Sequence, residues 1–560
     1  MDMKLKSPLE NFIKWESTKE KETFLIQPIN GKNYEYSWGK VGEEARKICN
    51  YINSLNLPKH SKIAILSKNC AHWIIADLAI MMSGNISVPI YANVNGKTAK
   101  YILEHSESKL LFVGKLEESD WNQIESHLPN NITKVDFGNY DLDCDYEKWD
   151  NIISDYEPIK TLNKINLDSI ITIIYTSGTT GNPKGVMLSH GGILSNCEGA
   201  REILDSLVKK DQPVFLTWLP LSHSYEHTVQ YVQISLGAKV YYAESLEKLL
   251  TNMNVAKPTI MTAVPRFYQN LYSKISINFL KQKGFKKKLI ENTILLGTKT
   301  LNNEILNFNE KIINFLCEKL VRKKIKNQFG GRLKAFVSGG GALDQKIGEF
   351  LNSIGLPTLQ GYGLTETSPV VSCNIPGKIK IETVGPPFKT NNVKIANDGE
   401  ILVKGENVML GYWNMKKETE EVIKNGWLHT GDIGEITKDG NLKITDRKKE
   451  IIVNLGGDNI SPSKIENLLS LQEKIKQSFI YGDKKTYLVA LIVTESLENK
   501  KEIEFYIENL NKTLSSVEKV KKFKLINEEF TIENGMLTPT MKLKRKKILK
   551  KYKEDLEKLY

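Results

Sequence analysis

An alternation of strand and helix patterns after residue 60 restricts the fold of this chain more than any other feature of its sequence. Short apolar runs rich in β-branched residues predict buried strands at Lys62–Leu66, Ile86–Ile90 and Leu110–Val113. The segments between them, residues 71–82 and 97–104, have the length and spacing of helices. Strands separated by helices in this way predict βαβ units around a mainly parallel sheet. At 560 residues the chain is also too long for one core, so we expect at least two domains.

Composition indicates a globular protein, and the net charge indicates anionic partners. Its longest apolar run, Trp73 to Met82, contains Asp77 and is about half of a membrane span. The first residues lack the apolar core of a signal peptide, and the six cysteines have no metal-like spacing. We therefore expect reduced thiols and a cytoplasmic protein. The net charge of +12 suits anionic partners, whether nucleotides, coenzyme A, acidic lipid headgroups or nucleic acid.

A loop rich in glycine and hydroxyl groups follows another apolar run, Ile170–Ile174. Its residues are Thr176, Ser177, Gly178, Thr179, Thr180 and Gly181, with Lys184 just beyond. Glycine lets the backbone approach a ligand closely, and adjacent N–H groups can then bind phosphate. The loop is not a Walker motif, because Lys184 is followed by Gly185 rather than by Ser or Thr. A surface loop without a ligand would have the same composition, so both interpretations stay open at this point.

Polar and glycine-rich segments follow three further predicted strands, at residues 215–219, 332–337 and 358–360. They contain His223, the glycines Gly339 and Gly340, and the run Tyr362, Gly363, Leu364, Thr365 and Glu366. Open α/β sheets bind ligands at the carboxyl ends of their strands. The tyrosine offers an aromatic face for a purine, and the glutamate is a hard ligand of the kind that Mg²⁺ prefers. The histidine alone could equally be a core or helix-capping residue.

From Val384 onward the pattern changes to short strands separated by the turn dipeptides Asp398-Gly399, Asn425-Gly426 and Asp439-Gly440. This pattern predicts a small β subdomain. It includes Asp432, whose carboxylate could accept hydrogen bonds from two ribose hydroxyls.

The remaining residues have the features of a separate small α/β domain. Ser461 and Pro462 predict a helix start, and residues 479–481 and 488–494 predict strands. A basic helix with one apolar side closes the chain. We therefore predict an α/β protein with a large N-terminal domain at residues 1–446. It would combine parallel sheets, flanking helices and the β subdomain, and a small mobile α/β domain would follow at residues 447–560.

A lysine-rich stretch before residue 328 has helical periodicity. Its apolar residues recur at helical spacing, at Ile305, Phe308, Ile312, Phe315, Leu316 and Leu320. The lysine groups 286–288 and 323–326 are interpreted as a solvated helical face, with contact to membrane headgroups as the alternative.

Several of these segments, taken together and in this order, resemble the adenylate-forming enzymes, the superfamily of acyl-CoA synthetases and luciferases. The matching segments are residues 175–186, 220–227, 361–369, 426–433 with 446–450, and 537–545. The block from Val264 to Leu343 is most similar to the long-chain fatty acyl-CoA synthetases.

The resemblance implies roles for the matching residues. The loop from Thr176 to Gly181 and Lys184 would hold the β- and γ-phosphates of ATP, and Glu366 would bind Mg²⁺ beside Thr365. The adenosine and α-phosphate would contact Gly339, Gly340, Tyr362, Gly363, Asp432 and Arg447. His223 would border the acyl carboxylate, Lys449 would be the hinge, and Gly456 and Gly457 would line the coenzyme A tunnel. The catalytic lysine would be Lys542, with Lys544 as the alternative because Met541 replaces the usual glycine.

The implied reaction converts a medium- or long-chain fatty acid and ATP to an acyl adenylate, and then to a coenzyme A thioester with release of AMP and pyrophosphate. Two anions must meet in the first step, so the site needs positive charge and aligned N–H donors. Transfer to acyl carrier protein and a non-catalytic lipid- or nucleotide-binding relative are the alternatives. Nucleic-acid binding has no reading motif to support it. Peripheral contact with the inner face of an anionic membrane stays open.

Overall fold

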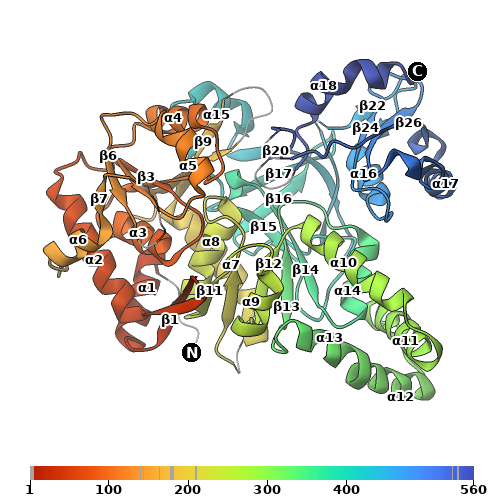
Figure 1. The fold of residues 1–560 in the computed structure, drawn as a ribbon, viewed down its shortest axis with the longest axis horizontal. Coiled ribbons are helices and arrows are strands. Elements are labelled where there is room, and N and C mark those ends of the chain that lie inside the picture. The colour runs from red at the N-terminus through yellow and green to blue at the C-terminus, as the bar shows by residue number, and fades with distance from the viewer. Residues whose placement is uncertain are drawn as a thin grey trace.

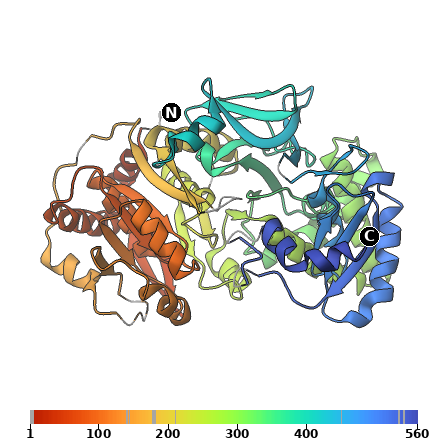
Figure 2. The ribbon, with the colours of Figure 1, turned by 90° about the horizontal axis from the view of Figure 1, so that it is seen from above.

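The structure, a computed structural model, describes residues 6–138, 140, 142, 144–162, 164–176, 182–208, 211–448, 450–531, 534–538 and 542–560. The chain forms two large sheets with their helices, a smaller β sheet and a C-terminal α/β unit (Figure 1, Figure 2). The predicted α/β class is confirmed.

The first sheet has eight strands in the order β18-β9-β8-β4-β3-β5-β6-β7. Its strands are β3 (Lys62–Leu66), β4 (Ile86–Ile90), β5 (Leu110–Val113), β6 (Thr133–Asp136), β7 (Glu147–Lys148), β8 (Ile170–Thr176), β9 (Lys184–Ser189) and β18 (Gly411–Tyr412). From β8 to β7 all neighbours are parallel, as the βαβ pattern predicts. The connecting helices are α3 (Ala71–Met82), α4 (Gly96–His105), α5 (Glu118–Glu125) and α6 (Trp149–Asp155).

One end of this sheet differs from the sequence-based expectation. The glycine-rich loop joins β8 to an antiparallel strand, β9, which periodicity did not reveal. The short strand β18, from more than two hundred residues further along the chain, pairs antiparallel with β9. Strands β8 and β9 therefore form an antiparallel pair, and the β18 segment lies beside β9.

The second sheet also has eight strands, in the order β15-β14-β13-β12-β10-β11-β1-β2. Its strands are β1 (Thr23–Ile29), β2 (Lys32–Ser37), β10 (Val214–Thr217), β11 (Lys239–Tyr242), β12 (Ile260–Ala263), β13 (Ala335–Ser338), β14 (Thr358–Gly363) and β15 (Val370–Cys373). Strands β14 to β1 are parallel, and the two edge strands are antiparallel. Parallel order brings the carboxyl ends of β10, β13 and β14 to one edge, where the predicted site residues follow them.

Helices cover both large sheets and share one core. They are α1 (Pro8–Thr18), α2 (Trp38–Ser54), α7 (His190–Val208), α8 (Ser224–Ser235), α9 (Leu249–Ala256), α10 (Pro265–Leu280) and α14 (Gln345–Ser353). Every residue of α3 is buried, which fits its uninterrupted apolar run. The largest apolar cluster combines residues of both sheets, among them Ile63, Phe112, Phe215 and Ile260. The two sheets are therefore joined by a common core.

An outlying group of helices follows α10. It consists of α11 (Gly284–Leu301), α12 (Phe308–Cys317), a π-helical segment Glu318–Arg322 and α13 (Lys323–Gln328). Figure 1 shows α11 and α12 at an outer corner of the molecule. Among the described residues, no helix has the length and apolar character that crossing a bilayer demands.

The β subdomain is a five-stranded sheet of β16 (Asn391–Ile395), β17 (Glu400–Gly405), β19 (Ile423–Lys424), β20 (Trp427–Ile436) and β21 (Leu442–Arg447), with helix α15 (Lys416–Val422). The dipeptide Asn425-Gly426 joins β19 to β20, and both residues have positive φ. This is the conformation that a two-residue hairpin turn of this sequence adopts.

The C-terminal unit has its own core. It contains β22 (Ile452–Val453), β23 (Asn459–Ile460), β24 (Gln477–Tyr481), β25 (Leu488–Val493), β26 (Val520–Ile526), α16 (Pro462–Leu469), α17 (Lys500–Asn511) and α18 (Arg545–Glu557). Ser461 caps α16 as predicted, by accepting the Lys464 N–H. Two apolar clusters lie on either side of β24 and β25 and consist of residues beyond 450.

Candidate active site

A tight turn after β14 holds Thr365 and Glu366. A Cβ atom on Gly363 would lie 1.8 Å from the carbonyl oxygen of Pro369, so only glycine fits where the chain turns. The Leu364 N–H donates to the Thr367 hydroxyl at 3.0 Å and closes the turn. The Thr365 hydroxyl lies 3.0 Å from the Ser224 hydroxyl at the start of α8. The turn therefore lies against the start of α8.

Glu366 is joined to the glycine-rich hairpin through Tyr412. The Tyr412 hydroxyl donates to Glu366 Oε1 at 2.8 Å, and the Lys184 ammonium lies 4.8 Å from the centre of the tyrosine ring. The Met409 N–H donates to the Glu366 carbonyl oxygen and fixes the backbone. Burial, followed by the Glu366 carboxylate, raises the pKa of Tyr412, so its hydroxyl stays a donor. Tyr412 therefore contacts both Lys184 and Glu366.

Sequence reasoning missed Tyr412. It lies in β18, whose partner β9 is far away in the sequence, and no local periodicity or spacing connects it with Glu366. The aromatic pair Tyr412-Trp413 after Gly411 was the only local signal.

Asp432 connects β14 with the β subdomain. Its Oδ2 accepts the Tyr362 hydroxyl at 2.8 Å, and its Oδ1 accepts the Arg447 Nε–H at 2.9 Å. Arg447 is the cross-strand partner of Asp432 in the β20–β21 hairpin, and Asp432 is 4% exposed. Burial and the Asp432 charge raise the pKa of Tyr362 well above its ordinary value. Burial opposes the charge of Arg447, but the neighbouring Asp432 outweighs it and raises the pKa of the guanidinium.

His223 is the N-cap residue of α8. Its Nδ1 accepts the Tyr225 N–H at 3.1 Å, which assigns the ring proton to Nε2. Burial, followed by repulsion from Lys542, lowers the pKa of His223 to about 3, so the ring is neutral. The histidine therefore both caps the helix and presents an Nε2–H donor, and the two interpretations from the sequence are compatible.

The glycines after β13 accommodate α8. A Cβ atom on Gly339 would lie 2.8 Å from the Tyr225 ring, and the Tyr225 hydroxyl donates to the Val337 carbonyl oxygen at 2.9 Å. Gly340 has a φ of +78°, which favours glycine. Gly339 therefore lets the strand end pack closely against the start of α8.

Lys542 belongs to a loop of the C-terminal unit that is closed at its base. Leu537 and Leu543 form a β-bridge, and the Thr538 N–H donates to the Lys542 carbonyl oxygen at 2.8 Å. Immediately after the loop, Arg545 forms an ion pair of 2.7 Å with the buried Glu466. These contacts attach the loop firmly to the C-terminal core.

The electrostatic surroundings of Lys542 connect it to the site. Solvent reaches the residue, yet protein crowds around its ammonium, and this desolvation together with the charge of Arg447 lowers its pKa to about 8. Asp432, Glu450 and Glu366 act in the opposite direction. The Arg266 guanidinium of α10 donates to the Lys476 carbonyl oxygen of the C-terminal unit at 3.1 Å. Lys542 therefore interacts electrostatically with Arg447, Asp432 and Glu366, which are predicted residues of the site.

Some predicted residues are not placed. Ser177, Gly178, Thr179, Thr180, Gly181 and Lys449 lie outside the described residues. Thr176 and Lys184, which flank the loop, are cross-strand partners at the end of the β8–β9 hairpin. Gly456 and Gly457 form an exposed turn between β22 and β23, closed by the Asp458 N–H donating to Asn454 at 2.9 Å. The neighbouring Leu455 N–H donates to the Lys485 carbonyl oxygen, so this turn is anchored on the C-terminal unit.

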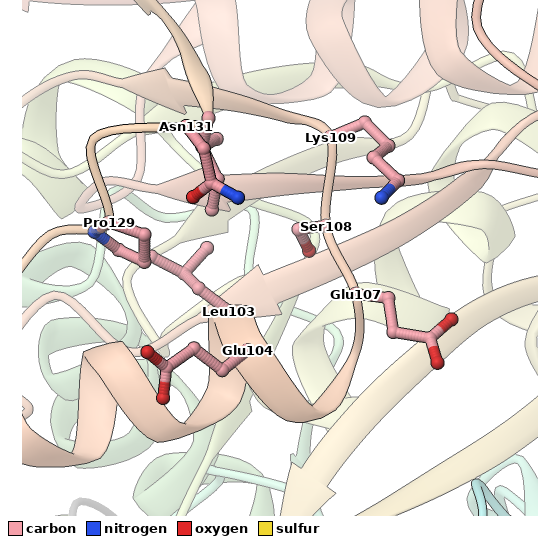
Figure 3. Close-up of a pocket in the computed structure, with 8 residues that line it drawn as sticks. Leu103, Glu104, Glu107, Ser108, Lys109, Pro129 and Asn131 are labelled. Atoms are coloured by element: carbon pink, nitrogen blue, oxygen red, sulfur yellow. The ribbon is translucent and has the colours of Figure 1, made fainter.

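A surface hollow elsewhere does not compete with this site. It lies between α4 and the start of β6 and is lined by Leu103, Glu104, Glu107, Ser108, Lys109, Pro129, Asn131 and Ile132. Figure 3 shows the carboxylates of Glu104 and Glu107 turned away from each other, and Glu107 is paired with Lys62 at 3.0 Å. The hollow therefore has no converging polar groups and none of the predicted site residues.

Comparisons with known proteins agree with this geometry. A family model described as "AMP-binding enzyme" matches residues 12–413, and one described as "AMP-binding enzyme C-terminal domain" matches residues 449–560. The chain is 30% identical to the long-chain-fatty-acid–CoA ligase FadD15 of Mycobacterium tuberculosis, over 95% of this chain and 93% of the relative. It is also 30% identical to long-chain-fatty-acid–CoA ligase 5 of Rattus norvegicus, over 94% and 85%.

Solved structures share the fold. The O-succinylbenzoate coenzyme A synthetase of Bacillus subtilis in complex with AMP has a TM-score of 0.72 and 21% identity, covering 97% of this chain and 98% of its own. The anthranilate CoA ligase AuaEII in complex with anthranoyl-AMP has a TM-score of 0.77 and 18% identity, with 98% of both chains covered.

Proposed function

The chain belongs to the AMP-binding enzyme family, and from this we propose that it is a fatty acid–CoA ligase. It activates a medium- or long-chain fatty acid with ATP to an acyl adenylate and then transfers the acyl group to coenzyme A, releasing AMP and pyrophosphate. The observation that carries the proposal is the convergence of Lys184, Glu366, Asp432, Arg447 and Lys542, which come from separate elements, around one site. The names of the relatives supply the substrate class.

The nucleotide is positioned from three directions. Tyr362 offers its ring to the adenine, and Asp432 accepts hydrogen bonds from the ribose while Arg447 and Tyr362 hold its carboxylate in place. The hairpin from Thr176 to Lys184 receives the β- and γ-phosphates. Because these contacts are formed before the reaction, they lower its barrier through positioning.

Magnesium is accommodated by the chemistry of the residues present. Among the described residues, no cluster of three His, Cys, Asp or Glu side chains could hold a metal ion. Mg²⁺ commonly uses one or two carboxylates together with substrate phosphates, so Glu366 beside Thr365 fits this role. When bound, the ion would neutralise charge on the pyrophosphate leaving group. Tyr412, which donates to Glu366, orients its carboxylate.

The first half-reaction joins the fatty acid carboxylate to the α-phosphate. Lys542 and the neutral His223, through its Nε2–H, are the donors assigned to the oxygens of the two anions. Charge develops between these groups as pyrophosphate leaves, and a fixed ammonium there stabilises the transition state more than the ground state. Gly339 and Gly340, which follow β13, are assigned to contacts with the nucleotide.

The second half-reaction needs a different position of the C-terminal domain. We assign residues 1–446 and 447–560 to the two domains and Lys449 to the pivot between them. Rotation there withdraws Lys542, together with its closed loop, and brings Gly456 and Gly457 toward the path of the pantetheine arm. The exposure of the Gly456–Gly457 turn in the present arrangement supports this division of the reaction.

The alternatives are weaker. The relatives are named as CoA ligases, which favours coenzyme A over acyl carrier protein as the acceptor. A non-catalytic binding protein would have no use for a lysine held beside Arg447 and Asp432. Cytoplasmic location with peripheral contact to an anionic membrane belongs to the same proposal.

The test is carboxylate-dependent exchange of labelled pyrophosphate into ATP, across acids from acetate to oleate. We expect exchange with the longer chains and a thioester product when coenzyme A is added. Exchange limited to short or aromatic acids would contradict the substrate class. Absence of exchange with every acid would contradict adenylation.

A further inference from the structure

Helix α12 turns its apolar face toward solvent. Phe308, Ile312, Phe315 and Leu316 follow the spacing of one helical face, which in a globular protein normally packs on the core. Within α12 only Cys317 is buried, and Phe308 is 77% exposed. Ile305 before the helix and Leu320 after it are 94% and 42% exposed. We call the six residues Ile305, Phe308, Ile312, Phe315, Leu316 and Leu320 the apolar strip.

Polar contacts on the opposite face fix this orientation. Glu310, Asn314 and Cys317 lie at helical spacing on the inner face of α12. Glu310 pairs with Lys299 of α11 at 2.7 Å, and Asn314 accepts a hydrogen bond of 2.8 Å from the buried Arg322. Turning the apolar strip inward would break both contacts and take Asn314 away from the buried Arg322. The exposure of the strip is therefore built into the fold.

The exposed apolar residues concentrate in this part of the molecule. Of the 22 large hydrophobic side chains exposed among the described residues, ten lie between Ile277 and Leu320. Soluble monomers rarely expose such a continuous apolar surface without using it. Figure 1 shows α12 at the outer rim of the molecule, where a partner can reach it.

The apolar strip lies among cations. Residues 281–328 contain twelve Lys and Arg residues against four Glu, so they carry +8 of the chain's net charge of +12. Lys286, Lys287 and Lys288 at the start of α11 are exposed, and so is Lys311 within α12. The Lys319 ammonium lies 4.5 Å from the centre of the Phe315 ring, beside the strip itself.

We propose that α11, α12 and the segment 318–328 dock the protein on an anionic phospholipid membrane, with the apolar strip inserted among the lipids and the lysines on the headgroups. An interfacial helix combines an apolar face with flanking cations in this way, and each feature strengthens the binding that the other provides. A second copy of the chain fits less well, because a two-fold contact through this surface would place two segments of charge +8 against each other. The proposal rests on the peripheral membrane contact included in the proposed function and assigns it to a defined surface, and vesicle binding tests it separately from the ligase activity.

The experiment is co-sedimentation of the full-length protein with vesicles of phosphatidylcholine alone and of phosphatidylcholine mixed with phosphatidylglycerol. One variant replaces two residues of the apolar strip, Phe308→Gln with Phe315→Gln. Its matched control is Phe505→Gln on α17, where the side chain is 59% exposed. A second variant reverses Lys286, Lys287 and Lys288 to Glu. Its control reverses the exposed lysines 416 and 417 of α15.

We expect the wild type and both controls to bind the anionic vesicles, and to bind them less at high salt. The apolar variant should lose on the order of tenfold or more in binding, and the charge variant on the order of a hundredfold. Pyrophosphate exchange with a soluble acid should stay unchanged in every variant, which shows that each is folded.

Three results would overturn the proposal. The first is a wild type that fails to bind anionic vesicles, and the second is a pair of variants that bind as well as their controls. The third is a dimer, detected by sedimentation velocity, that the Phe308 and Phe315 substitutions abolish, because a second copy of the chain would then be the occupant of the surface.

Discussion

The rate of adenylation should fall in alkaline solution because the pKa of Lys542 is lower than that of an ordinary lysine. The lysine must be protonated to stabilise the charges that meet in the first half-reaction, and its pKa is lowered to about 8 by desolvation and by Arg447. With this lowered pKa, the Lys542 side chain is mostly protonated below pH 8 and mostly neutral above it. The rate should therefore be full near pH 7 and fall as the pH rises through 8.

The size of the effect follows from the protonated fraction. With a pKa of about 8, roughly 90% of the lysine is charged at pH 7 and roughly 10% at pH 9, a loss of about ninefold. An ordinary lysine, with a pKa of about 10.4, would still be about 96% charged at pH 9. The pKa values of two neighbouring site groups, His223 and Tyr362, lie outside this window. Burial puts the pKa of His223 at about 3, and the pKa of Tyr362 is shifted well upward.

The assay is the pH profile of kcat/KM for pyrophosphate exchange, since kcat/KM reports the pKa values of the free enzyme. The control is Lys542→Arg, because a guanidinium stays charged throughout this range. We expect the alkaline limb to disappear in that variant, whatever its absolute rate.

Two results would refute the reasoning. A wild-type profile that is flat up to pH 9 would show that Lys542 is not desolvated in the free enzyme. An alkaline limb that persists unchanged in Lys542→Arg would assign the titration to a different group.

Three further substitutions test the assignment of roles. Lys542→Ala should slow adenylation on the order of a hundredfold or more, and should spare thioester formation from supplied acyl adenylate, measured as two separate reactions. Asp432→Ala removes the ribose acceptor and should raise the KM for ATP roughly 10- to 100-fold in the exchange assay. Gly363→Ala places a Cβ 1.8 Å from the Pro369 carbonyl oxygen, which displaces the turn that holds Glu366. It should lower Tm by several degrees and the exchange rate on the order of a hundredfold.

Matched variants decide what these results mean. Lys544→Ala should leave exchange intact, and a larger loss there than in Lys542→Ala would move the catalytic role to Lys544. Glu435→Ala lies on the same strand as Asp432 but is exposed, so an equal rise in KM would contradict a ribose contact. Gly341→Ala makes only ordinary contacts with Pro265, and a fall in Tm matching that of Gly363→Ala would contradict the steric argument.

Local pattern was sufficient for much of the fold. The segment 71–82 is apolar throughout and becomes a helix with these bounds, and the Asn425-Gly426 dipeptide forms the hairpin turn that its positive φ values favour. In such segments the local preference and the tertiary environment agree. The predicted order of strands and helices followed from this agreement.

Contacts between distant segments could not be predicted. The pairing of β18 with β9 is set by tertiary packing, and it alone brings Tyr412 to Glu366. Periodicity predicted helical structure with apolar residues at helical spacing from Ile305 to Leu320, but it contains no information on which way that face points. The direction is decided by Glu310 and Asn314, whose partners lie outside α12.

The separate apolar clusters of the C-terminal unit have a calorimetric consequence. A unit with its own core melts as a cooperative transition of its own, so a heating scan of the chain should contain two endotherms. At about 0.7 kcal/mol per residue, the smaller would absorb about 80 kcal/mol and the larger about four times as much. If the smaller endotherm comes first, heat removes Lys542 from the reaction while the nucleotide site of the larger unit is still folded. Adenylation and nucleotide binding would have separate thermal limits.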